Sequence, residues 1–115
     1  MISKELLNEV LNVEIYGIEI PRDFLDSNTD HITIWFNEYE RSRINIHELA
    51  HKCKEWALDN GYEIVSRILS SDHQKTGHCY IVKCEYEYEK VIKIFNEKTE
   101  PEAIFKSCQW ILENK

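Results

Sequence analysis

The 115-residue chain contains only three glycines and two prolines, which leaves little material for flexible linkers or glycine-rich phosphate loops. No low-complexity segment divides it, so we predict a single domain over residues 1–115. Long apolar runs are also missing, and none approaches the roughly 18 residues of a membrane-spanning helix. Charged residues interrupt the N-terminal segment where a signal peptide needs an apolar core. We therefore expect a cytoplasmic protein that does not bind membranes.

Cationic residues are scarce as well. The chain has 14 Lys and Arg residues against 21 Asp and Glu residues, which gives a formal net charge of −7. Such a surface repels a phosphate backbone, and the largest basic cluster is the small pair Arg41 and Arg43. We expect no direct binding of nucleic acid. An acidic surface favours instead a protein partner of basic charge.

The cysteines do not form a metal-binding or redox motif. None of the four is part of a C-x-x-C pair, and Cys53 and Cys108 fall on the apolar stripes of predicted helices. His78 and Cys79 are adjacent, and adjacent residues of a strand point to opposite faces. We interpret these residues as structural, in a reducing compartment and with no cofactor.

The run from His47 to His51 reads H-E-L-A-H, which matches the H-E-x-x-H signature of zinc metalloproteases. In those enzymes the two histidines lie four residues apart on one side of a helix and bind zinc, and the glutamate acts as general base. Glu48 would be that base here. A zinc-dependent hydrolase using His47, Glu48 and His51 is therefore an alternative reading.

The context of this run favours the start of a helix. Asn45 is a typical N-cap, and Glu48 three residues later completes a capping box. The residues recurring at helical spacing are apolar and exclude both histidines: they are Ile46, Leu49, Ala50, Cys53, Trp56 and Ala57. Lys54 and Ala57 occupy the positions at which the extended motif needs glycine and histidine. His73, His78 and Glu85 are distant candidates for a third ligand, so we predict no metal and no catalytic residue.

The periodicities predict the α+β class, with amphipathic helices packed on an antiparallel sheet. We expect helices over residues 3–12, 46–60 and from about Glu100, where Thr99 is the N-cap and Pro101 stands in the first turn. Strands are expected over residues 13–20, 31–36, 62–69, 78–88 and 90–96, with a long hairpin loop over 70–77.

The strand over 78–88 alternates strongly. Its predicted inner, apolar face holds Tyr80, Val82, Cys84, Tyr86 and Tyr88, and its solvated face holds Lys83, Glu85 and Glu87. We predict that Glu85 and Glu87 bind a partner. Trp35 and Trp110 are candidate aromatic anchors because each lies off the main apolar face of its element. Burial against a second layer is the alternative for both tryptophans.

Two segments support a family resemblance. Residues 46–57 with Asn60-Gly61-Tyr62, and residues 99–112, resemble small phage and prophage proteins, including the phage ABA-sandwich family. The resemblance covers roughly the second half of the chain, and its motifs concern packing and capping. It implies a compact sheet with helices packed on it and a phage origin, and it implies no activity.

Three functional hypotheses follow. The first, which we favour, is a non-enzymatic phage or prophage accessory protein that binds a host or viral protein, for example as an acidic inhibitor of a host nucleic-acid-handling defence system. The second is the zinc hydrolase. The third is a structural or self-associating protein with no ligand. The sequence does not fix the oligomeric state.

Overall fold

The computed structural model describes residues 2–20, 30–71, 74–85 and 88–115, without the side chains of residues 71, 84, 85 and 88. The described elements, in chain order, are α1 (Lys4–Leu11), β1 (Gly17–Glu19), β2 (His31–Trp35), β3 (Arg41–Asn45), α2 (Ile46–Asp59), β4 (Tyr62–Ser71), β5 (Gln74–Glu85), β6 (Tyr88–Glu97) and α3 (Glu100–Asn114). The α+β class is confirmed. The strands form two three-stranded antiparallel sheets instead of one: sheet A has the order β1-β2-β3, and sheet B has the order β4-β5-β6.

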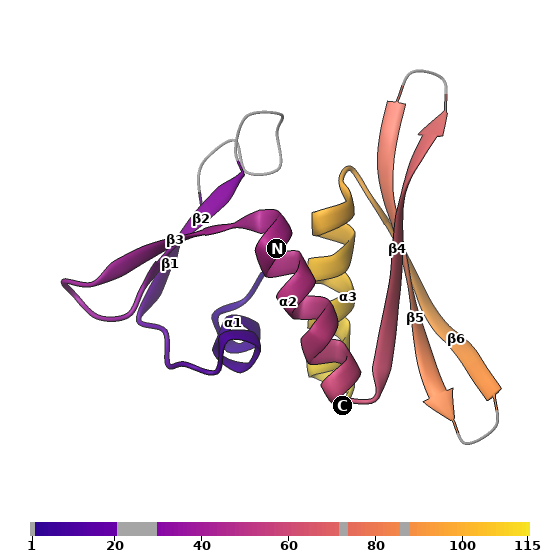
Figure 1. The fold of residues 1–115 in the computed structure, drawn as a ribbon, viewed down its shortest axis with the longest axis horizontal. Helices are drawn as coiled ribbons and strands as arrows, with labels where there is room; N and C mark the ends of the chain where they lie inside the picture. The colour runs from indigo at the N-terminus through magenta and orange to yellow at the C-terminus, as the bar shows by residue number, and fades with distance from the viewer. Residues whose placement is uncertain (1, 21–29, 72–73, 86–87) are drawn as a thin grey trace.

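The two sheets share one layer of helices. Helices α2 and α3 lie side by side, with sheet A and α1 on one side of them and sheet B on the other (Figure 1). A continuous apolar core runs through this layer, from Ile32 and Ile34 of β2 to Ile81 of β5. The helices cover only one face of sheet B, and this arrangement determines which side chains stay open to solvent.

Polar side chains fix the start of each helix. The hydroxyl of Ser3 accepts from the backbone N–H of Leu6 at 3.1 Å at the start of α1. The hydroxyl of Thr99 accepts from the N–H of Glu102 at 3.3 Å at the start of α3. These bonds satisfy N–H groups that have no partner within the helix. The predicted starts of α2 and α3 are thus confirmed, and so is the burial of the predicted α2 stripe.

The hairpin between β4 and β5 is longer than predicted. The predicted loop over 70–77 is wrong, because β4 continues to Ser71 and β5 begins at Gln74, with these two residues paired in register. The side chains here are polar and gave no strand signal. Backbone N–H and C=O groups nevertheless complete the antiparallel ladder, which does not depend on side-chain polarity.

Strand β3 was not predicted either. Its sequence, Arg41–Asn45, is polar, and Ile44 is its only apolar residue. The segment pairs along its whole length with β2, so that Ile44 lies opposite the buried Ile32. An edge strand can be held by a single apolar side chain that points toward the core. One apolar residue does not make an alternating pattern that can be recognised in the sequence. Strand β1 is shorter than predicted, covering only Gly17–Glu19 of the expected 13–20.

The faces of β5 are opposite to the prediction. Cys79 and Ile81 are fully buried among the core residues, so the odd-numbered positions face the helices. Tyr80 is therefore on the other face. Lys83, predicted to face solvent opposite the core, pairs with Tyr62, whose ring packs on Trp110 of α3. The alternation divided the strand into two faces correctly. The helices cover the face of Cys79 and Ile81, however, and not the face of Tyr80.

We predict that Leu49→Ala lowers the free energy of unfolding by roughly 2 to 5 kcal/mol, because the side chain is fully buried and the change leaves a cavity. Chemical denaturation measures the effect. Leu58→Ala is the matched control on the same helix, since Leu58 is 57% exposed, and it should change the stability by well under half as much. Equal effects of the two substitutions would contradict the assigned face of α2.

Gly77 is predicted to tolerate no side chain. A Cβ atom at this position would lie 2.0 Å from the carbonyl oxygen of Thr99, where the chain enters α3. Gly77→Ala should therefore destabilise the protein by about 1 to 3 kcal/mol, because sheet B and α3 must move apart. At Gly17 a Cβ would meet nothing within 4 Å, and Gly17→Ala is the control. A thermal melt in which both variants match the parent would refute the close approach.

Candidate functional site

The H-E-L-A-H run forms the first turns of α2. The side-chain oxygen of Asn45 accepts from the N–H of His47 at 2.8 Å and from that of Glu48 at 3.2 Å. The predicted N-cap is confirmed. Among the described residues, however, the backbone N–H of Asn45 donates no hydrogen bond to the Glu48 carboxylate, so the reciprocal half of the predicted capping box is wrong. Asn45 is also the last residue of β3, in register with His31, and its main chain belongs to the sheet.

The two histidines of the run are exposed, and the Nε2 atom of His51 lies 2.8 Å from the Glu55 carboxylate. Of the proposed third ligands, His78 lies on the face of sheet B away from the helices and is hydrogen bonded to Asn96 at 2.6 Å. His73 and the side chain of Glu85 fall outside the described residues. Within the described part of the chain, no three His, Cys, Asp or Glu side chains are arranged to hold a metal ion.

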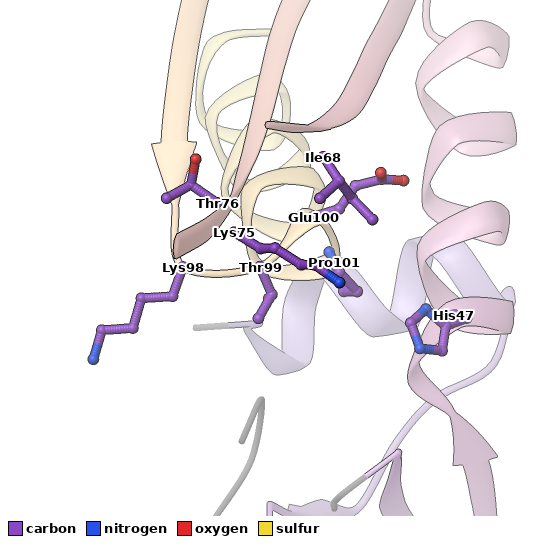
Figure 2. A pocket seen from close by; sticks show the side chains of 8 residues that line it. All are labelled: His47, Ile68, Lys75, Thr76, Lys98, Thr99, Glu100 and Pro101. Atoms are coloured by element: carbon purple, nitrogen blue, oxygen red, sulfur yellow. The ribbon is translucent and has the colours of Figure 1, made fainter. Parts of the chain in front are cut away.

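A cavity of about 240 Å³ lies beside His47 (Figure 2). It is bordered by the starts of α2 and α3 and by the β4–β5 hairpin, and its lining residues are His47, Ile68, Lys75, Thr76, Lys98, Thr99, Glu100 and Pro101. Figure 2 shows the Lys75 side chain extending toward Pro101 and His47, whereas Lys98 points away.

The polar groups of this cavity have structural partners. The Glu100 carboxylate accepts from the hydroxyl of Ser66 at 3.3 Å, and the hydroxyl of Thr99 is used as the cap of α3. No described nucleophile in the cavity is hydrogen bonded to a base, which is the arrangement that nucleophilic catalysis needs. The described residues of the cavity therefore do not form a nucleophile–base pair.

The described cysteines are equally unsuited to nucleophilic chemistry. Cys53, Cys79 and Cys108 are fully buried. Burial is the main cause that raises the pKa of Cys79 to about 11. The pKa of Cys108 is also raised, by its hydrogen bond with Cys53 and then by burial. The thiols of Cys79 and Cys108 therefore stay protonated at neutral pH, and the burial of Cys53 and Cys108 agrees with the structural role predicted for them.

Trp35 lies on the face of sheet A opposite the core, as predicted. It is half-buried like Thr33, whereas Ile32 and Ile34 are buried. The guanidinium of Arg41 lies 5.3 Å from the centre of the Trp35 ring, in cation–π contact. This contact fixes the indole against its own sheet. Its role as a partner anchor stays a prediction.

Trp110 packs within the fold. Its half-buried ring meets the ring of Tyr62 edge to face, with centroids 6.4 Å apart and planes at 88°. The contact joins α3 to β4 and gives Trp110 a packing role. Glu87 lies outside the described residues, and of Glu85 only the main chain is described, in register with Tyr88. The partner-binding roles of these three residues stay predictions.

The face of sheet B turned away from the helices was not anticipated as a site. We call it the open face. Cross-strand register places Val65, Tyr80 and Ile94 in one row and Glu63, Val82 and Val91 in the next. Val91 and Ile94 are 52% and 55% exposed, and no described helix covers this side (Figure 1). Val82 is buried but is not part of the main core cluster. The open face is therefore apolar in its middle.

Charges lie on both sides of the apolar middle of the open face. Arg67, His78 and Asn96 form the row on one side, and Leu69 and Thr76 follow beyond it on the same face. Glu63 and, one row beyond it, Glu89 carry the opposite charge on the other side. A sequence signal for this face did exist, because β4 and β6 contain Ile-Val, Ile-Leu and Val-Ile pairs, in which neighbours must occupy both faces.

Comparisons with protein-family models, with curated proteins and with solved structures found no match to this chain. Among the described residues, no helix has the length and apolar character to cross a membrane.

We predict that Asn45→Ala lowers the stability by about 0.5 to 2 kcal/mol, because two N–H groups of α2 lose their acceptor. Glu48→Ala should cost only a few tenths of a kcal/mol, the size of a favourable charge at a helix N-terminus. Urea denaturation of both variants distinguishes them. A larger loss for Glu48→Ala than for Asn45→Ala would show that Glu48 has a stronger structural role than the geometry gives it.

Proposed function

We propose that this protein is non-enzymatic and works by binding a protein through the open face of sheet B. The observation that supports this most is the apolar middle of that face, where Val65, Tyr80, Val91 and Ile94 have no covering helix or strand among the described elements, beside the buried Val82. A contiguous apolar surface on a sheet is typical of an interaction site.

The energetics favour a covered face. Burying an exposed valine or isoleucine side chain completely is worth about 1.5 to 3 kcal/mol. Val91 and Ile94 are each about half exposed and can gain part of that free energy when a second surface packs on them. A partner that covers the row of Val65, Tyr80 and Ile94 would make the same kind of interior that α2 and α3 make on the opposite face.

A protein fits this face better than other ligand classes. The cavities at His47 and beside Trp35 lie away from the apolar middle of the open face. Nucleic acid is disfavoured by the net charge of −7 and by Glu63 and Glu89 on the face itself.

The biological setting remains a prediction. A role as a phage or prophage accessory protein, for example an inhibitor of a host nucleic-acid-handling defence system, is supported by the net charge and by the resemblance of residues 46–57 and 99–112 to phage proteins. A basic partner would match this charge. Zinc hydrolysis has no comparable support, because no described third ligand accompanies His47 and His51.

A photo-crosslinking amino acid at Ile94 tests the proposal in cells that express the chain. Leu58 on α2 is the matched control position, since the two side chains are 55% and 57% exposed. We expect Ile94 to give a discrete protein adduct and Leu58 to give none or much less. Equal diffuse labelling from both positions, with no discrete adduct, would contradict binding through the open face.

A further inference from the structure

Sheet B has two edge strands, β4 and β6, in addition to its open face. Strand β6 carries Lys90 and Lys93, and both are exposed. Charged lysines on an edge strand are a common means of preventing strand-to-strand association. Pairing with a second sheet along the β6 edge is therefore disfavoured, and the open face offers the larger apolar surface for association.

The charges of the open face are arranged with opposite signs about its apolar middle. On β4, Glu63 precedes Val65 by two residues and Arg67 follows it by two, so both side chains share the face of Val65 at equal distances from it. Neither charged group has an ion-pair partner among the described residues. The face thus carries a positive side and a negative side, separated by roughly 13 Å of strand.

We propose that the open face binds a second copy of this chain in a two-fold symmetric dimer. This inference rests on the proposed function and names the partner of the same surface. A two-fold axis that crosses the strands at the row of Val65, Tyr80 and Ile94 reverses the strand direction between the two sheets. It places Glu63 of each copy over Arg67 of the other.

This geometry satisfies the requirements of a symmetric interface. An interface of this kind uses the same patch on both copies and must be complementary to itself. The apolar row packs on its own copy at the axis, as in the core of a β-sandwich, and two equivalent ion pairs close the rim. A partner with a uniformly acidic or basic surface would oppose one side of the open face in either orientation.

The dimer should be weak. Three strands spaced about 4.8 Å apart make a face only about 15 Å wide, at the small end of specific protein interfaces. We therefore expect association in the micromolar range. Sedimentation velocity from about 1 to several hundred micromolar protein follows the equilibrium directly.

A charge exchange between Glu63 and Arg67 provides the test. Arg67→Glu and Glu63→Arg alone should each weaken the dimer by about tenfold or more, because like charges then face each other at both rim positions. The double variant, with both substitutions, should recover most of the association. Recovery is not expected if either residue acts only within its own chain.

Lys52→Glu is the control, since it makes the same charge change as Arg67→Glu at an exposed position on α2. It should leave the dimer intact, and circular dichroism of every variant checks the fold. A parent chain that stays monomeric at all concentrations, or a double variant no better than the single ones, would overturn the self-association. If the Ile94 crosslink then contains a different protein, the proposed function stands while this inference fails. A crosslink at the mass of two chains supports both.

Discussion

The structure depends on a single layer of helices that both sheets must share. The β3–α2 junction at Asn45 and the α2–β4 turn at Gly61 tie α2 to both sheets, and Gly61 adopts a φ of 87° that suits a residue without a side chain. The packing is close where α2 and α3 meet: the buried Cys108 thiol donates to the carbonyl of Cys53 at 3.4 Å. With α2 and α3 committed to one face of sheet B, the described chain has no further element for the other.

Features that depend on residues close together in the chain could be predicted from sequence. Features that depend on contacts between residues far apart in the chain could not. Asn45 and Thr99 mark helix starts because a cap acts on the residues two or three positions later. The covered face of β5 was assigned wrongly because Tyr80 and Ile81 are both apolar enough to be buried. The choice between them is made by α3, which approaches so closely that only Gly77 fits beneath Thr99. No pattern within β5 contains that information.

The candidate site also combines features set by neighbouring residues with features set by long-range contacts. The solvent-side placement of Trp35 followed from alternation within β2, which is a local property. The open face was not predicted as a site, because the sequence pattern assigned the aromatic and aliphatic side chains of β5 to the core. Val91 and Ile94 join Tyr80 and Val65 only through cross-strand register, which includes an irregularity between Ile81 and Val82. Register of this kind is set by the complete sheet, and a short segment does not encode it.

The central claim is that a second copy of the chain covers the open face of sheet B. Hydroxyl-radical footprinting at low and high protein concentration tests it most directly, because it reports the solvent exposure of each side chain. Oxidation of Tyr80 and Ile94 should fall as the concentration rises, whereas Tyr39, which is 88% exposed on the loop after β2, should react equally at both. Unchanged oxidation across the open face, or protection at Tyr39 instead, would contradict the account.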